Sequence, residues 1–434
     1  MTAARPVRRL CRVEAEQAWA HLLAEGTGQV TTRFTVLAAF GAQYLDRVVA
    51  RWARRFPALS LRIGEQDDGL WFRRPDGEPP GRAGQQELGP GRTPEQLLAE
   101  EAGTVLPPCG PLWRLRIVHA RRDCVTHFYL TCHPAICDTY TVGRLVRALL
   151  DLLFGEEPEH PGPPHRFTEQ LMPDQDELTY RAPAVSAMPA APWPGTPAPA
   201  PSGAGVVAQA GALGDRLWQL SLSPRQHAGL KSWCGSRRIT LDQLFAALLA
   251  TGLARAAGHD RVEVLTALSL RRRYAESTRL SDIGCCVATL RTELCAGGGS
   301  PADLARAYAA RVTAADAAWR PERLGHAGTR ATVTDQAAGA VGTTARFASE
   351  GSADTVLGGH ARRVTEFLSA ARPGPDVAAS LQLSVFQGQL RMLVSCGRAA
   401  AQRRAAEAVR AELAGALPYT LANSPNSCPT PWPA

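Results

Sequence analysis

No stretch of this 434-residue chain is apolar for long enough to cross a membrane. A membrane-spanning helix needs about 20 consecutive apolar residues, and no run here reaches ~18. The segment from Met1 to Arg12 is basic, but no apolar segment follows it, so we predict no signal peptide. We therefore expect a soluble, cytoplasmic protein with no membrane partner.

Lysine is almost absent, since Lys231 is the only one among 48 basic residues. The net charge of +8 therefore resides on arginine, and a basic surface attracts acidic partners. The sequence contains no nucleic-acid-binding module and no basic–aromatic pattern, so we expect no nucleic-acid partner. The charge either reflects an arginine bias with solvated side chains or serves an acidic carrier protein or the phosphates of a pantetheine-bearing substrate.

The 11 cysteines are odd in number and form no CxxC pair. Without a secretion signal, reduced and mostly buried thiols are expected. Cys132, His133 and Cys137 are close in the sequence, but their spacing matches no zinc pattern. We expect no metal site and no cofactor held by the protein itself.

A segment rich in proline and alanine divides the chain. Residues 181–205 carry proline at a density that neither a helix nor a central strand tolerates, which predicts an extended linker. Trp193 in its middle either docks on a surface or is exposed. We predict an N-terminal lobe at residues 1–175, a linker at 176–214 and a C-terminal lobe at 215–434.

Both halves mix predicted helices and strands. The clearest helices are 39–56, which ends at Phe56-Pro57, and 241–257, where Thr240 and Gln243 form a capping box and Gly258 ends the helix. Alternating apolar residues predict strands at 113–118, 126–131, 261–270 and 286–294 and a hairpin at 381–394, whereas 73–94 reads as loop. The elements do not alternate regularly enough for a doubly wound parallel sheet, so we predict the α+β class.

The most informative stretch runs from Leu130 to Gly143 and reads LTCHPAICDTYTVG. A predicted strand precedes it and a predicted helix follows it. His133 and Asp138 thus lie five residues apart in a strand-to-helix turn, a place where functional sites are often built.

This turn resembles the HHxxxDG signature of the condensation-domain superfamily, which includes chloramphenicol acetyltransferase, the condensation domains of nonribosomal peptide synthetases and polyketide-associated acyltransferases. Aligned without a gap, His133 takes the place of the first His, Asp138 of the Asp and Thr139 of the Gly. Pro134 stands where the family has its second His, the catalytic base.

Other fragments resemble the family in the same order along the chain. They are a helix-Pro-strand unit similar to "HPxLR" at 56–62, Ser269-Leu270-Arg271 similar to "DLR", and Ile283-Gly284. The resemblance implies two chloramphenicol-acetyltransferase-like lobes in a pseudo-dimeric V arrangement with a central tunnel. The family's DFGWG motif is absent, which favours a stand-alone member.

The residues of the turn suggest different roles. Pro134 has neither a titratable group nor an N–H, so it can be neither base nor donor. Because strand side chains alternate, Pro134 shares a face with Cys132 while His133 points to the opposite face, unless a bulge turns it around. His133 is therefore either a displaced catalytic base or a structural residue, and the thiols of Cys132 and Cys137 are alternative nucleophiles.

The resemblance also implies a structural ion pair. The family aspartate binds an arginine that holds the turn, and Asp138 would pair with Arg271 or, as second choice, with Arg272. Thr139 and Tyr140 replace the motif glycine, which narrows the conformations open to the turn.

Two functions follow from the resemblance. The first is an acyltransferase, or a cyclase that works by positioning, with His133 as catalytic residue and with Pro134, Cys132, Thr139 and Tyr140 in contact with the substrate. The substrate would be an acyl group on a carrier protein or coenzyme A, passed to a small-molecule acceptor. The second is an inactive condensation fold that recruits an acyl or peptidyl carrier protein or a tailoring enzyme.

Overall fold

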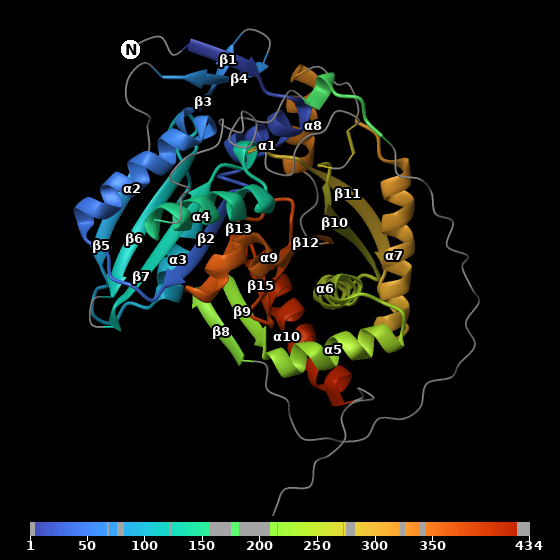
Figure 1. Cartoon of the computed structure of the whole chain (residues 1–434). Coiled ribbons are helices and arrows are strands. Elements are labelled where there is room, and N and C mark those ends of the chain that lie inside the picture. The colour runs from blue at the N-terminus through green and yellow to red at the C-terminus, as the bar shows by residue number, and fades with distance from the viewer. Residues whose placement is uncertain are drawn as a thin grey trace, which may run out of the picture.

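The computed structural model describes residues 5–66, 69–75, 82–120, 123–155, 175–181, 209–214, 216–271, 273–274, 283–321, 326–338 and 343–422. Helices and strands are mixed throughout, and the strands form three sheets. The two larger sheets lie in different halves of the molecule (Figure 1). The predicted α+β class is confirmed.

The first large sheet has the strand order β13-β2-β7-β6-β5. Its strands are β2 (Val30–Val36), β5 (Arg82–Glu87), β6 (Trp113–Ala120), β7 (Val125–Cys132) and β13 (Val364–Ala371). The predicted antiparallel pairing of β6 with β7 is present. Strand β5, which runs parallel to β6, lies in the segment predicted as loop. That prediction was wrong because the surrounding glycines and prolines obscure a strand that carries no apolar alternation of its own.

Strand β13 departs from the predicted division of the chain. It belongs to the C-terminal half in sequence, yet it pairs with β2 along its length, from Val364 opposite Val36 to Ala371 opposite Val30. A lobe boundary between 175 and 215 therefore does not describe the first sheet.

The predicted linker also contains regular structure. β8 (Gln209–Gly214) pairs with β9 (Leu217–Leu222), so the C-terminal half begins before residue 215. Most of the predicted linker, including Trp193, lies outside the described residues.

Helices cover both faces of the first sheet (Figure 1). The helices of this half are α1 (Arg12–Leu23), α2 (Ala42–Arg55), α3 (Pro94–Gly103) and α4 (Thr139–Leu153). α2 and α4 share one core with Phe34 and Phe128 of the sheet, and Trp52 Nε1 of α2 donates to the Leu145 carbonyl of α4 at 2.9 Å. On the other face Leu97 of α3 packs in a separate cluster with sheet residues, so the sheet is enclosed.

The second large sheet has the order β11-β10-β12-β14-β15-β9-β8. Its further strands are β10 (Arg261–Ser269), β11 (Val287–Cys295), β12 (Thr344–Ser352), β14 (Ala379–Phe386) and β15 (Gln389–Ser395). The predicted hairpin is β14–β15, and the strands predicted at 261–270 and 286–294 are β10 and β11, which pair antiparallel.

The core of the C-terminal half is formed by this sheet together with α5 (Pro224–Ser236), α6 (Leu241–Ala257), α7 (Pro301–Ala318) and α10 (Ala400–Ala422). The other two helices pack on the first half instead, α8 (His326–Ala338) on α1 and the short α9 (Ala353–Leu357) on α4. The predicted start of α6 is confirmed, because the Thr240 hydroxyl accepts the Gln243 N–H at 3.2 Å. Its predicted end is confirmed as well, since Gly258 adopts a φ of +67°, which a residue without Cβ reaches at no cost.

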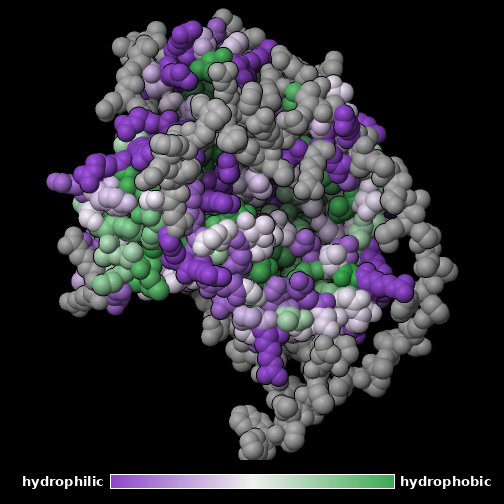
Figure 2. All heavy atoms as spheres, viewed as in Figure 1, coloured by the Kyte–Doolittle hydropathy of each residue, from purple (hydrophilic) through white to green (hydrophobic). Residues whose placement is uncertain are grey.

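A small sheet of β1 (Arg5–Arg9), β4 (Gly69–Arg74) and β3 (Arg62–Gln66) packs beside α1 and α2. In the part of the chain that the structure describes, no single helix is long and apolar enough to span a membrane. α5 and α6 reach that length and composition only as a pair, bent by 92°. Hydrophilic side chains project from the periphery of the molecule on the face shown in Figure 2.

Candidate functional site

The turn from β7 into α4 is built by the alternation of β7. Phe128, Leu130 and Cys132 point into the core shared with α2 and α4, while Tyr129 belongs to the cluster on the other face. The strand ends at Cys132 because Pro134 cannot supply the next N–H. The chain then makes a short 3-10 helix, Pro134–Ile136, before α4 begins.

His133 is the N-cap of this 3-10 helix and is almost fully buried, with 2% of its surface exposed. Its Nδ1 accepts the Ala135 N–H at 3.1 Å, and its own N–H donates to the Leu112 carbonyl at 2.8 Å. The ring lies against the His21 ring of α1, with centroids 4.2 Å apart. Burial, and secondarily His21, hold the pKa of His133 well below its usual range, so the ring is neutral. These contacts give His133 a capping role.

Pro134 packs against the turn that joins α1 to β2. Gly28 in this turn has a φ of +79°, and a Cβ placed on it would be 3.3 Å from the Pro134 ring and 3.1 Å from Gln17 Oε1. Gln17 and Thr27 line a cavity between the two halves, whereas Pro134 and His133 do not. The position of the family's base is thus enclosed by its own half of the molecule.

Asp138 and Arg271 form the predicted ion pair, and both side chains are buried, with 4% and 2% exposed. The Arg271 Nε–H and Nη2–H donate to the carboxylate at 2.8–3.0 Å. Asp138 also caps α4, since its Oδ1 accepts the Thr141 N–H at 2.8 Å. The second-choice partner, Arg272, lies outside the described residues.

Thr141 extends this network across the two halves. Its hydroxyl donates to the Gly284 carbonyl at 2.9 Å and accepts from Arg271 Nη2 at 2.9 Å. The sequence pattern did not single out Thr141, although it follows Asp138 by three residues, which is where a helix cap finds its partner.

Thr139 and Tyr140, predicted to contact the substrate, lie on the exposed first turn of α4. The Tyr140 ring sits 5.0 Å from the Arg271 guanidinium carbon. Close backbone approach occurs instead at Gly143, where a Cβ would be 2.2 Å from Val356 Cγ1 of α9. A glycine is therefore required four residues beyond the motif position, inside α4, where α9 packs closely against the helix.

The cysteines of the turn are buried, Cys132 completely and Cys137 with 3% exposed. Burial, together with Cys132 and Asp138, raises the pKa of the Cys137 thiol well above its ordinary value. A protonated thiol is a poor nucleophile. Among the described residues no group of three or more His, Cys, Asp and Glu could hold a metal ion.

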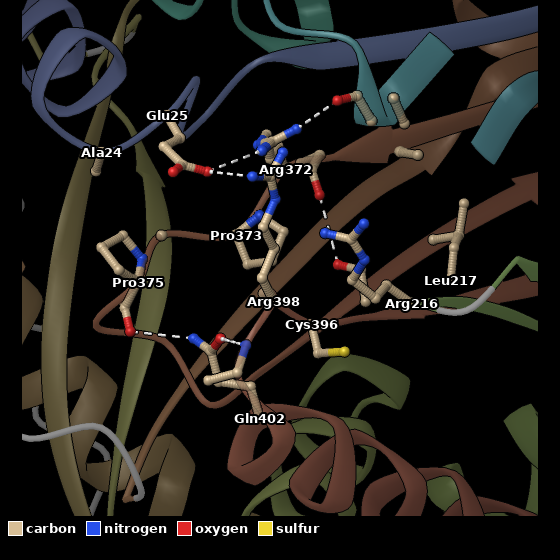
Figure 3. Close-up of a pocket in the computed structure, with 18 of the residues that line it drawn as sticks. Ala24, Glu25, Arg216, Leu217, Arg372, Pro373, Pro375, Cys396, Arg398 and Gln402 are labelled. Atoms are coloured by element: carbon tan, nitrogen blue, oxygen red, sulfur yellow. Dashed lines mark hydrogen bonds and ion pairs between the residues drawn. The ribbon is translucent and has the colours of Figure 1, made fainter. Parts of the chain in front are cut away.

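Two cavities lie where the halves meet. The first has a volume of about 510 Å³ and is bounded by α1, β10, β11 and α7, with Glu16, Arg291, Arg346 and Asp376 among its polar lining. The second has a volume of about 690 Å³ and is bounded by the ends of α1, α3, β13 and β15 and the start of α10 (Figure 3). Ala24, Gly374 and Pro375 line both cavities, so the two are neighbours.

None of the seven predicted site residues lines either cavity. The predicted residues are Cys132, His133, Pro134, Asp138, Thr139, Tyr140 and Arg271. The cavity-lining arginines, among them Arg372 and Arg398, were not predicted, because arginine is frequent throughout the chain and only the fold brings these residues together.

No family model matches the sequence, and no curated protein matches it. Solved structures do match in fold. Polyketide synthase associated protein 5 from Mycobacterium tuberculosis aligns with a TM-score of 0.62 and 16% identity over 96% of this chain and 99% of that one. The first condensation domain of the CDA synthetase aligns with a TM-score of 0.64 and 16% identity over 96% and 97%. The tallysomycin biosynthesis protein TlmII aligns with a TM-score of 0.60 and 14% identity over 98% and 100%.

Proposed function

We propose, for a chain that has the fold of the condensation-domain superfamily, that it is a binding protein of natural-product biosynthesis. It holds an acyl or peptidyl group, delivered on a carrier protein or on coenzyme A, between its two halves, and it does not transfer that group through a motif histidine. The observation that carries the proposal is the enclosure of His133 and Pro134 behind the Gly28 turn.

The argument against histidine catalysis begins with geometry. A general base must come within hydrogen-bond reach of the proton that it removes, or within reach of one bridging water. The Nδ1 of His133 is occupied by the Ala135 N–H, and its ring packs on His21. His133 could reach a substrate as a base only if α1, which carries His21, moved away from its ring.

A carrier protein is the partner that fits the chain best. The net charge of +8 favours an acidic partner, and steering by charge accelerates encounter more than it strengthens the final complex. The thioester substrate brings its own phosphopantetheine or coenzyme A, so we expect no resident cofactor.

Acyl transfer by positioning is the second candidate. The ion pair between Asp138 and Arg271 is intact, and the two cavities meet at Ala24, Gly374 and Pro375, as a donor and an acceptor site would. Holding two reactants together can lower the activation barrier by several kcal/mol. Loss of a general base slows the reaction by ~10²–10⁴-fold, so proximity can offset much of that loss. This candidate requires an acceptor that is already nucleophilic.

Mass spectrometry distinguishes the two candidates. The protein is incubated with acyl-loaded carrier protein and candidate amines or alcohols, and the acyl group is followed by intact mass. We expect a complex with the loaded carrier protein and no transferred product. Product that forms equally with His133→Asn would establish transfer by positioning, and product that disappears with this variant would restore His133 as the base.

A further inference from the structure

The larger cavity collects positive charge from three separate segments. Arg216 precedes β9, Arg372 follows β13 and Arg398 precedes α10. Figure 3 shows the three arginine side chains around the same space, with Glu25 reaching toward Arg372 and Arg398.

The anionic groups of this cavity do not balance its cations. Glu25 Oε2 lies 3.2 Å from Arg398 Nη1 and 3.7 Å from Arg372 Nη2, so one carboxylate is shared by two guanidinium groups. The other lining acid, Glu100, is engaged by Arg92 and Arg116. Among the described residues that line the cavity, three arginines therefore stand beside one carboxylate that arginines outside the cavity do not engage, and that carboxylate contacts two of the three.

Arg372 is the most constrained of the three. Its side chain is only 13% exposed, and its Nη1–H donates to the Gly103 carbonyl at 2.8 Å. Burial, followed by the neighbouring charge of Arg398, lowers the pKa of Arg372 despite the opposing effect of Glu25. A bound anion would relieve this repulsion.

The rest of the lining is mostly apolar. Its apolar side chains include Leu23, Ala99, Ala102, Leu217, Pro373 and Pro375. The volume of about 690 Å³ lies within the ~300–1,000 Å³ of ordinary small-molecule sites. An apolar enclosure with arginines on its wall suits a ligand that has an apolar body and an anionic group.

We propose that this cavity binds an amphipathic organic anion, whose carboxylate or phosphate is held by Arg216, Arg372 and Arg398 while its apolar part lies against the cavity wall. Guanidinium groups bind both oxyanions through paired N–H donors. Glu25 then acts as an internal counter-ion that the ligand displaces. This binding site stands whether or not the protein transfers acyl groups, because binding is measured directly.

Calorimetry on the full-length protein at low salt tests the proposal with two matched pairs of probes. Octanoate is compared with octanamide, and 4′-phosphopantetheine is compared with pantetheine. We expect an anionic probe to bind at least about tenfold more tightly than its neutral partner, a difference of ~1.4 kcal/mol. Preference for octanoate alone identifies a free carboxylic acid as the ligand, and preference for phosphopantetheine alone identifies a phosphate-bearing one. Equal binding within both pairs, or no binding of either anion, overturns the proposal.

Three single substitutions test whether the anion binds in the larger cavity. Arg398→Ala, at a side chain that is 62% exposed, should weaken the preferred anion at least about fivefold. Glu25→Gln should strengthen it, because the competing carboxylate is gone. Arg261→Ala, at an 82% exposed arginine that lines neither cavity, is the control for loss of one positive charge. Identical anion affinities in Arg398→Ala and Arg261→Ala, or weaker binding in Glu25→Gln, would place the anion elsewhere and reject the proposal.

Discussion

At position 133 an imidazole caps a helical turn. The Nδ1 of His133 accepts the Ala135 N–H, a role that Ser, Thr, Asn or Asp side chains fill at most helix starts. The same ring fills space against His21, so it contributes both a hydrogen bond and buried surface. Both contributions are structural, and each can be removed separately.

The first prediction separates the cap from the buried surface. In His133→Asn the amide oxygen can replace Nδ1 as acceptor, whereas His133→Ala removes the acceptor as well. Loss of a cap costs about 1 kcal/mol, so the alanine variant should be less stable than the asparagine variant by about that amount. Urea unfolding followed by circular dichroism measures both. Equal stabilities would show that the hydrogen bond to Ala135 N–H contributes nothing.

The second prediction concerns Glu350, a part-buried carboxyl on β12 that accepts a hydrogen bond from the Gln382 amide. Burial raises its pKa from 4.5 to about 7, which means that the folded state holds this proton more tightly than the unfolded state. The stabilising contribution of the protonated acid is therefore present below about pH 4.5 and is lost as the pH rises through about 7.

Glu350→Gln keeps a neutral side chain at every pH. Relative to the wild type, this variant should gain roughly 1–3 kcal/mol in unfolding free energy between pH 5 and pH 8. Chemical denaturation at both pH values measures the difference. A stability difference that does not change with pH would mean that Glu350 titrates normally.

At the scale of elements, the ion pair between Asp138 and Arg271 joins the start of α4 to the chain that leaves β10. Thr141 and the Gly284 carbonyl extend the same network. α4 belongs to the first sheet's half and β10 to the second, so this network fixes the two halves against each other near the motif.

The third prediction is that Asp138→Asn destabilises the protein by about 3–5 kcal/mol, because it leaves the Arg271 charge buried without a counter-ion. Asparagine still caps α4, so the loss reports the ion pair itself. Glu293→Gln, which disrupts an exposed pair with Arg261, should change stability by less than ~0.5 kcal/mol and serves as control. An unchanged melting temperature in Asp138→Asn, together with lost activity on a thioester, would instead make Asp138 a catalytic residue.

Local signals predicted local structure well. The capping box and Gly258 located α6, and the alternation around Gln387-Gly388 located the β14–β15 hairpin. An equally local signal at α3 was missed, since Thr93 and Gln96 form a capping box and Pro94 occupies the first helical position between them. The place of β13 could not be predicted, because its partner β2 lies far away in the sequence and their pairing depends on the whole sheet. Strand β5 was missed because it carries no apolar alternation of its own.

At the candidate site too, some features could be predicted from the sequence and others could not. The partnership of Asp138 and Arg271 followed from the resemblance of the motif, and the structure contains this ion pair. That the motif would be enclosed by α1 and Gly28 could not be inferred, since a tight turn with positive φ is not specific in sequence. The arginine cavity depends on the convergence of segments from both halves.

At the scale of the whole molecule, strand β13 connects the two halves, because it comes from the C-terminal half of the sequence and pairs with β2 of the first sheet. This strand closes the edge of β2, and neighbouring residues in the 372–377 segment line both cavities. Without β13, the backbone of β2 would be an open strand edge, which is prone to pair with other chains.

The fourth prediction follows for two fragments, 1–181 and 209–434. Expressed alone, fragment 1–181 should aggregate, because the sheet lacks its β13 edge. Expressed together, the fragments should co-purify, since β13 can pair with β2 in trans. Size-exclusion chromatography and circular dichroism measure both results. A monomeric, folded fragment 1–181 would show that the first sheet is stable without β13.

The pairing of β13 with β2 also sets an order of events during translation. The strands β2, β6 and β7 have all been synthesised once the ribosome passes Cys132, but β13 ends at Ala371, about 240 residues later. At ~5–20 residues per second, the nascent N-terminal half waits roughly 10–50 s with the β2 edge uncovered. A chaperone that binds exposed strand edges could act in this interval, so we expect the yield of folded protein to depend on the rate of synthesis and on the supply of chaperone as well as on final stability.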